Sequence, residues 1–200
     1  TSMTSSRSAD AIDFQLHRVT ALGHRVQVAS RRAIDSAAGQ PESLVIFGGM
    51  GANYELLKPL LRHFARFDLH VLEPPGTGGS SIPAVPIPMA TFARLARKAL
   101  ANLQISRAHL VGVSWGGALA QEYAHQFPRG CEKLVLVATS PGAISIPASP
   151  QILAKYVTPR RFLDPGYMQK IAGEIYGGVQ KADPSIAMNY AKRMQLRRGL

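Results

Sequence analysis

The run Gly-Val-Ser-Trp-Gly-Gly at residues 112–117 decides the fold, because it joins two segments of different periodicity. The residues before the serine, 108–113, form a short apolar run that is typical of a buried strand. The residues after it, 116–127, carry apolar side chains at helical spacing, which predicts a helix. A tight turn from a buried strand into a helix is the context in which a Gly-x-Ser-x-Gly motif carries chemical meaning.

This turn predicts a nucleophile elbow at Ser114. An elbow of this kind strains the serine backbone and exposes the hydroxyl at the end of the strand. Gly112 and Gly116 are the elbow glycines, two positions before and two after the serine, since small residues there let the strand and the helix approach closely. Ser114 is therefore the candidate catalytic nucleophile.

A second glycine-rich stretch, Gly-Gly-Met-Gly at residues 48–51, follows the apolar run 44–47. A serine nucleophile needs two backbone N–H groups aimed at the oxyanion that develops during the reaction. We expect one N–H from Trp115, directly after the serine. The other is expected from Met50 in this glycine loop, where Gly49 is the glycine that precedes the donor.

The rest of the chain alternates strand-like and helix-like segments. Residues 13–21 and 24–32 predict a hairpin. From residue 44 the predicted order alternates strand and helix, over residues 44–47, 53–66, 69–73, 91–103, 108–113, 116–127 and 133–138. Such alternation predicts an α/β protein whose mostly parallel sheet is joined by right-handed crossovers.

The composition changes after Ser140. Six prolines separate short helical segments there, and nothing after Ala138 has the pattern of a strand. We therefore divide the chain into a polar leader at 1–13, the N-terminal part of an α/β core at 14–140 and an incomplete helical cap at 141–200. On this division the C-terminal part of the sheet is missing from the 200 residues.

Composition excludes several classes of protein. Apolar residues make up 46% of the chain, enough for a core, and no apolar run reaches the roughly 18 residues that span a bilayer. The single cysteine, Cys131, and six histidines give no metal-ligand set of the cysteine-rich type. The glycine-rich stretch 75–80 is followed by prolines instead of a helix N-terminus, which argues against a nucleotide site. The sequence therefore predicts neither a metal nor a cofactor.

The net charge of +11 is concentrated at one end, since the last fifty residues hold nine basic and three acidic side chains. No nucleic-acid-binding module or aromatic-rich basic platform accompanies this charge, so no nucleic-acid partner is expected. A basic surface that faces anionic lipid fits better. The N-terminal residues lack the apolar core of a signal peptide, and a lone cysteine suits a reducing compartment. We therefore expect a cytoplasmic protein.

Five stretches of the sequence carry a resemblance to one family. They are Phe-Gly-Gly-Met-Gly-Ala-Asn at 47–53, Pro-Pro-Gly-Thr-Gly-Gly-Ser-Ser at 74–81, Ser-Trp-Gly-Gly-Ala-Leu-Ala-Gln at 114–121, Lys-Leu-Val-Leu at 133–136 and Ile-Tyr-Gly-Gly at 175–178. The order of these loops looks like an α/β-hydrolase, and residues 14–200 resemble the intracellular medium-chain poly(3-hydroxyalkanoate) depolymerases. The resemblance implies a polyester or acyl-ester substrate, a Ser-His-Asp triad and a helical lid, with a storage granule or anionic lipid surface as a partner.

Only the serine of that triad carries over to this sequence. The family's order is serine, then Asp, then His, and the one histidine after Ser114 is His125, about three turns along the predicted helix. The five earlier histidines are interpreted as solvated or core-edge side chains, and Asp164 and Asp183 as turn formers before prolines. We therefore expect the triad Asp and His to lie outside this chain, and the isolated 200 residues to lack efficient esterase activity.

Three hypotheses for the function remain. The first is a serine carboxylester hydrolase that acts on poly(3-hydroxyalkanoate) or related 3-hydroxyacyl esters through an acyl-enzyme on Ser114. The second keeps this nucleophile but transfers 3-hydroxyacyl groups from carrier thioesters. The third is a non-catalytic, basic granule-binding protein that keeps only the scaffold. The elbow and the glycine loop together favour a catalytic protein, and the resemblance favours the hydrolase.

Overall fold

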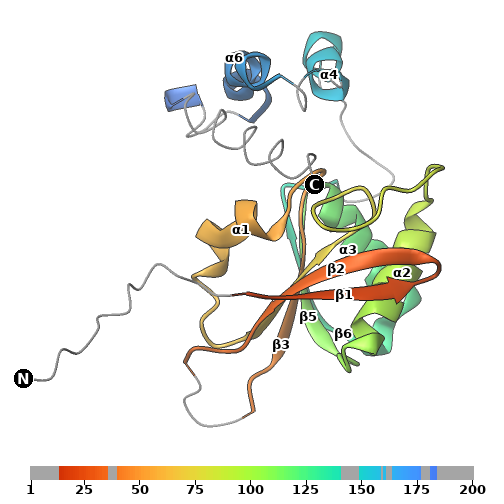
Figure 1. Ribbon diagram of the computed structural model, residues 1–200. Coiled ribbons are helices and arrows are strands. Elements are labelled where there is room, and N and C mark those ends of the chain that lie inside the picture. The colour runs from red at the N-terminus through yellow and green to blue at the C-terminus, as the bar shows by residue number, and fades with distance from the viewer. Residues whose placement is uncertain are drawn as a thin grey trace, which may run out of the picture.

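A computed structural model describes residues 14–35, 40–140, 149–158, 160, 164–176 and 181–183. These residues form one six-stranded sheet with helices on both of its faces (Figure 1). The strands are β1 (Gln15–Ala21), β2 (His24–Arg31), β3 (Ser43–Phe47), β4 (Asp68–Glu73), β5 (Ala108–Val113) and β6 (Cys131–Val137). Their order across the sheet is β1-β2-β4-β3-β5-β6.

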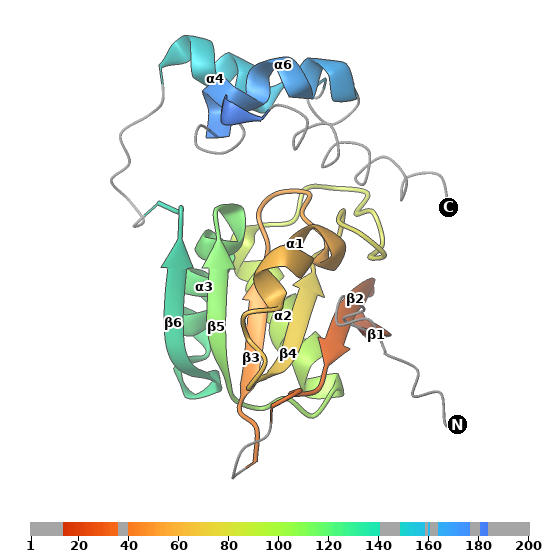
Figure 2. The same cartoon turned by 90° about the vertical axis from the view of Figure 1, so that its left-hand side faces the viewer.

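The sheet is antiparallel at one side and parallel elsewhere. Strand β1 pairs with β2, and β2 with β4, in antiparallel fashion, whereas β4, β3, β5 and β6 run parallel to one another. The predicted α/β architecture with a mostly parallel sheet is therefore confirmed, as is the hairpin. Because β3, β4 and β5 are parallel, the loops that follow them meet at one end of the sheet (Figure 2).

Helices cover the two faces of the sheet unequally. Helix α1 (Tyr54–Leu61) lies on one face, whereas α2 (Met89–Asn102) and α3 (Trp115–Gln126) lie on the other (Figure 2). A short 3₁₀ turn, η1 (Pro128–Gly130), follows α3 and leads into β6. The helices predicted at 91–103 and 116–127 are thus confirmed, with ends that differ by two residues or fewer.

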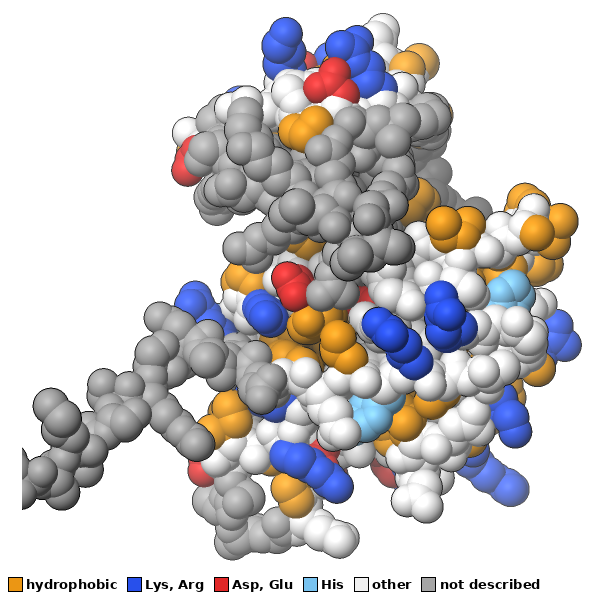
Figure 3. All heavy atoms as spheres, viewed as in Figure 1, with side chains coloured by type: hydrophobic (Ala, Val, Ile, Leu, Met, Phe, Trp, Pro, Cys, Tyr) orange, Lys and Arg blue, Asp and Glu red, His pale blue; other side chains and the backbone are white. Residues whose placement is uncertain are grey.

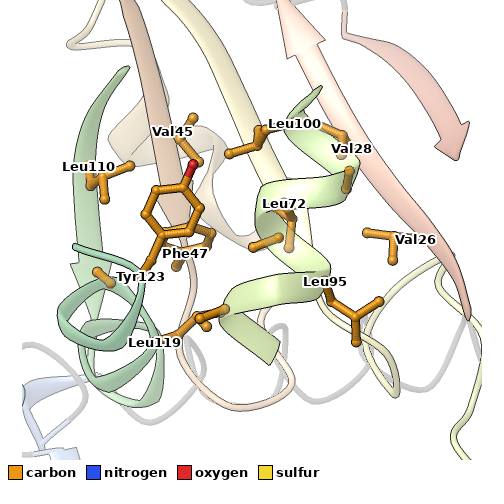
Figure 4. Packing of buried hydrophobic residues seen from close by; sticks show 14 of the residues in the cluster. Val26, Val28, Val45, Phe47, Leu72, Leu95, Leu100, Leu110, Leu119 and Tyr123 are labelled. Carbon is orange, nitrogen blue, oxygen red and sulfur yellow. The ribbon is translucent and has the colours of Figure 1, made fainter. Parts of the chain in front are cut away.

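The largest of three core clusters among the described residues lies between the sheet and the pair α2 and α3. Successive strand residues point to opposite faces, so Val45 and Phe47 of β3 enter this cluster together. Leu95 of α2 and Tyr123 of α3 meet them from the helical side, and the Tyr123 ring lies 6.0 Å from that of Phe47 (Figure 4). The second cluster lies under α1 and contains Leu44, Ile46, Tyr54, Leu61, Leu69 and Val71. The buried members of the third are only Met168, Ile171 and Ala172.

Helix α1 is shorter than the sequence predicts. Apolar spacing predicts a helix through Arg66, but α1 ends at Leu61. Beyond this point the N–H groups of His63 and Phe64 bond to carbonyls three residues back, which tightens the chain out of the α-helix. Pro59 lies inside the helix and has no N–H to donate, so the last turn is already weakened. The prediction of a longer helix was wrong because apolar spacing does not register these effects.

Strand β6 is an edge of the described sheet. Its apolar side chains are exposed on both faces, 36% at Leu134 and 51% at Val135. A strand of this kind presents unpaired backbone groups next to apolar surface, which is a template for pairing with another strand.

Two helices after the sheet, α4 (Pro150–Val157) and α6 (Pro165–Tyr176), lie beyond the carboxyl ends of the strands (Figure 1 and Figure 2). In the described part of the chain no strand follows β6. The predicted leader at 1–13 and residues 184–200 of the predicted cap lie outside the described residues. No helix among the residues described is both long and apolar enough to cross a membrane.

Asp164 has a structural role, as its place before a proline predicts. Its Oδ1 accepts the Tyr167 N–H at 3.0 Å and so caps α6. Its Oδ2 accepts a hydrogen bond of 3.1 Å from Arg160. The backbone bond from Tyr167, and then the bond from Arg160, lower the pKa of Asp164.

His70 of β4 makes the stability of the fold dependent on pH. Its Nδ1 lies 2.9 Å from the Ser30 hydroxyl, and burial of the ring lowers the pKa of His70 to about 4, against a smaller opposing effect of Asp68. The unfolded chain takes up a proton at His70 near pH 6.5, whereas the folded chain does so only near the lowered pKa of about 4. The stability contributed by neutral His70 is therefore lost as the pH falls between these two values.

We predict that His70→Gln flattens this pH dependence. Between pH 7 and pH 4.5 the wild-type chain should lose about 2 kcal/mol of unfolding free energy through this group, and the variant should not lose this part. Urea unfolding at the two pH values measures the difference. His125→Gln, at an exposed position on α3, is the control and should follow the wild type. Equal pH slopes for His70→Gln and the wild type would contradict the prediction.

Candidate active site

Ser114 occupies a sharp turn between β5 and α3. Its backbone has φ +54° and ψ −119°, a conformation that residues with a side chain rarely adopt. The Ser114 N–H donates to the Val137 carbonyl at 2.9 Å, and the Ser114 carbonyl accepts from the Gly117 N–H at 2.8 Å. The side chain does not cap α3. Backbone hydrogen bonds to β6 and α3 therefore hold the strained residue on both sides, and its hydroxyl is not used to cap the helix.

The glycines around this turn are required by close packing. A Cβ on Gly112 would lie 2.6 Å from the Gly116 carbonyl oxygen and from the Gly117 Cα, and a Cβ on Gly116 would collide with the Phe47 carbonyl. Gly117 has the same constraint, because its Cβ would lie 2.5 Å from Thr139. Helix α3 thus packs directly on the backbone of β5 and on the end of β3. Any larger residue at these positions would force the elements apart.

The glycine loop at 48–51 lies against the serine. A Cβ on Gly49 would be 3.5 Å from the Ser114 Cβ and 3.7 Å from the Val113 carbonyl oxygen, which is ordinary contact. The loop closes through a bond of 2.9 Å from the Ala52 N–H to the Gly49 carbonyl, with Gly51 at φ +76°. Met50, the residue after Gly49, is therefore carried past the serine, with 48% of its surface exposed.

Asn53 ends this loop and begins α1. Its side-chain oxygen accepts the Leu56 N–H at 3.1 Å, so Asn53 is the N-cap of this helix. The cap fixes the point at which the chain leaves the glycine loop, and hence the distance between that loop and the helix.

Trp115 is the first residue of α3, where backbone N–H groups have no partner within the helix. Its ring packs edge-on against Phe92 of α2, with centroids 5.1 Å apart. This contact ties the start of α3 to the neighbouring helix. Helix α3 thus begins directly after Ser114, and the glycine loop lies against the same serine.

A buried acid that no motif or periodicity of the sequence predicts supports these loops. Glu73, the last residue of β4, is fully buried. Its carboxyl oxygens accept hydrogen bonds from the Gln27 side chain at 2.8 Å, the Tyr54 N–H at 3.0 Å and the Gly79 N–H at 2.9 Å. One side chain therefore joins β2, the start of α1 and the loop after β4.

Ser80 completes this network. Its hydroxyl donates to the Glu73 carbonyl and accepts the Gln27 N–H at 2.8 Å. A Cβ on Gly78 or Gly79 would collide with the side chains of Glu73 and Gln27, which explains the glycines of the loop after β4. The signal in the sequence is an acidic residue that directly follows the apolar pair Val71-Leu72 and precedes a glycine-rich loop.

The described histidines lie away from the elbow. His125 is exposed and eleven residues beyond Ser114 on α3, which is about 16 Å of helix. His109 is the second residue of β5, at the opposite end of that strand, with its Nε2 3.2 Å from Glu42. Among the residues that the structure describes, no histidine is hydrogen-bonded to the Ser114 hydroxyl.

Comparisons with known proteins agree with this geometry. A family model described as the alpha/beta hydrolase fold matches residues 42–190. The chain belongs to this family. A crystal structure of Cfl2 from Burkholderia cenocepacia has a TM-score of 0.68 at 18% identity, with 88% of this chain and 65% of that chain covered. At such low identity this likeness establishes the fold alone.

Two curated relatives match the chain over part of their length. Poly(3-hydroxyalkanoate) depolymerase of Ectopseudomonas oleovorans is 42% identical over 154 residues, which cover 76% of this chain and 54% of the depolymerase. Pimeloyl-[acyl-carrier protein] methyl ester esterase of Chromobacterium violaceum is 34% identical over 108 residues, covering 52% of this chain and 39% of the esterase. The chain thus spans about half the length of these relatives or less.

We predict that Glu73→Gln lowers the free energy of unfolding by about 1–3 kcal/mol. An amide has one accepting oxygen where the carboxyl has two, so a donor such as the Gly79 N–H loses its partner inside the protein. Urea unfolding at neutral pH measures the loss. Glu174→Gln is the matched control, because Glu174 is an exposed partner of Lys155 and its loss should cost less than about 1 kcal/mol. Equal losses in the two variants would contradict the supporting role of Glu73.

Proposed function

We propose that this chain carries the nucleophile of a serine carboxylester hydrolase that cleaves the ester bonds of poly(3-hydroxyalkanoate) or of related 3-hydroxyacyl esters. The observation that carries the proposal is the Ser114 backbone at φ +54° with the glycine loop packed against it. The fold does not choose a substrate, because one fold serves many reactions. The identity of 42% to a poly(3-hydroxyalkanoate) depolymerase supports the substrate class.

In the proposed reaction the Ser114 Oγ attacks the carbonyl carbon of the ester while a general base takes the hydroxyl proton. The tetrahedral intermediate carries an oxyanion, which we assign to the backbone N–H groups of Met50 and Trp115. When the intermediate collapses, the C–O bond breaks and the alcohol leaves with the proton. Water then adds to the acyl group on Ser114, and the same steps in reverse order release the acid and restore the serine.

The general base and its acid partner are proposed to lie outside residues 1–200. The position of His125, far along α3, and the capping role of Asp164 support this assignment. A serine held in the elbow without its base keeps the oxyanion donors but loses proton transfer. Such a site retains only a small part of its catalytic power.

We also propose that α4 and α6 belong to a lid over this site, since they lie beyond the end of the sheet at which the elbow stands. The proposed place of action is the cytoplasm, at a storage granule or an anionic lipid surface. The net charge of +11 supports contact with an anionic surface. No cofactor takes part in the proposed reaction.

A fluorophosphonate probe tests the nucleophile. In the full-length protein that contains these residues, the probe is expected to label Ser114 covalently, because activated serines react with it and ordinary ones do not. Ser114→Ala should abolish labelling, as read by gel fluorescence and peptide mass spectrometry. Ser106→Ala, at an exposed serine far from the elbow, is the control and should leave labelling unchanged. Persistent labelling of Ser114→Ala would contradict the assignment.

The isolated 200-residue chain is expected to hydrolyse a p-nitrophenyl 3-hydroxyacyl ester at least about 10³-fold more slowly than the full-length protein, since it lacks the base. Release of p-nitrophenol measures the rate. Turnover at a rate typical of esterases, abolished by His125→Ala, would show that the base lies in this chain. With thioester substrates, separation of free acid from transferred product distinguishes hydrolysis from transfer, and predominant transfer would favour an acyltransferase.

A further inference from the structure

The loop between β4 and α2 displays apolar side chains to solvent. Residues 82–86 form its tip, in which Ile82 is 87% exposed and Val85 is 70% exposed. Figure 3 shows hydrophobic side chains gathered at the upper right of the molecule, over this loop. A large apolar side chain left in water costs free energy that burial elsewhere would recover.

The tip is held in a fixed position by the chain on both sides of it. The Ser81 N–H donates to the Arg25 carbonyl at 2.8 Å, and the Gly76 N–H donates to the Ser81 carbonyl at 2.9 Å. After the tip, Ile87 packs against the largest core cluster. The apolar side chains are therefore presented by a loop anchored at both ends.

The backbone of the tip suits transfer into an apolar layer. Pro83 and Pro86 have no N–H, so two of the five residues bring no donor that would need a partner away from water. An ordinary loop would carry more unsatisfied groups into such a layer.

The surroundings of the tip are cationic. No acidic residue occurs between Glu73 and Glu122, the part of the sequence that holds the tip and α2. Arg25, whose backbone pairs with Ser81, is exposed, as is Arg94 on α2. An apolar projection beside exposed arginines complements a layer that has a negative surface and an apolar interior.

The tip also lies on the functional side of the molecule. Strands β4, β3 and β5 are parallel, so their carboxyl ends lie at the same end of the sheet. The tip follows β4, the loop with Gly49 follows β3, and Ser114 follows β5. A protein that docks through the tip would therefore turn this end of the sheet toward the surface.

We propose that residues 82–86 insert into the surface of an anionic phospholipid layer, with Ile82 and Val85 as the apolar anchors and Arg25 and Arg94 as contacts for the headgroups. The proposal rests on the lipid-surface association proposed above and assigns it to one segment. It does not depend on the chemistry of Ser114.

Co-sedimentation with vesicles tests the proposal. The full chain is expected to bind vesicles of equal parts phosphatidylglycerol and phosphatidylcholine more tightly than vesicles of phosphatidylcholine alone, and added salt should weaken this binding. The double variant Ile82→Ser, Val85→Ser should partition at least about tenfold more weakly, because it lacks the two apolar side chains that the lipid layer would bury. Arg25→Gln with Arg94→Gln should remove the preference for the anionic vesicles.

Ile34→Ser is the matched control. Ile34 is 67% exposed but follows β2, which runs antiparallel to β4, so it lies at the opposite end of the sheet. Equal binding by the tip variant and this control would overturn the proposal, and so would the absence of vesicle binding by the wild type. Loss of self-association in the tip variant, with vesicle binding unchanged, would assign the tip to a contact between copies instead.

Ser114→Ala separates this proposal from the proposed function. This variant should bind vesicles as the wild type does, because the elbow takes no part in docking. Thermal unfolding verifies that the tip variant remains folded, which is expected because both replaced side chains are exposed. A failure of the fluorophosphonate test with vesicle binding intact would overturn the catalytic assignment and leave the docking surface in place.

Discussion

The carboxyl group of Glu73 is the constraint on which the carboxyl end of the sheet depends. A polar group that is completely buried must find its hydrogen bonds inside the protein, and Glu73 finds them in three separate segments. The hydrogen bonds of Glu73 therefore form only when the start of α1, the loop after β4 and strand β2 lie together around its carboxyl group. The glycine loop ends where α1 begins, so its exit from the site is fixed by the same group.

The elbow applies a second constraint of a different kind, because it depends on contact instead of hydrogen bonding. Gly116 lies against the carbonyls at the end of β3, and Gly49 lies against Ser114. Ser114 and the loop beside it are thus spaced by backbone atoms in contact, which vary less than side-chain rotamers. The separation between the glycine loop and Ser114 is held in this way without a further side chain.

Much of the fold could be predicted from the sequence, because the spacing of apolar residues within each segment indicates whether it forms a helix or a strand. Strand β5 has the predicted bounds, and α2 differs by two residues at its start, since apolar spacing in these segments matches the face that is buried. The proximity of residues 48–51 to Ser114 could be anticipated from parallel topology. The end of α1 could not, because Pro59 and the tightened turn after Leu61 outweigh an apolar pattern that continues to Phe64. Glu73 had no periodic signal, and its partner Gln27 lies 46 positions away in sequence.

The separation between Gln27 and Glu73 bears on the order in which the molecule assembles. The two residues are 46 positions apart, and Ser80 is 53 positions from Gln27, so each of these bonds closes a long segment of chain. The entropy lost in closing such segments is recovered only after the hairpin has docked on β4. The two strands of the β1–β2 hairpin are adjacent in sequence, so the hairpin can form early. The bond between Gln27 and Glu73 is expected to form later, because it closes a longer segment of chain. We therefore expect the loops that Glu73 joins to reach their final positions after the β1–β2 hairpin has formed.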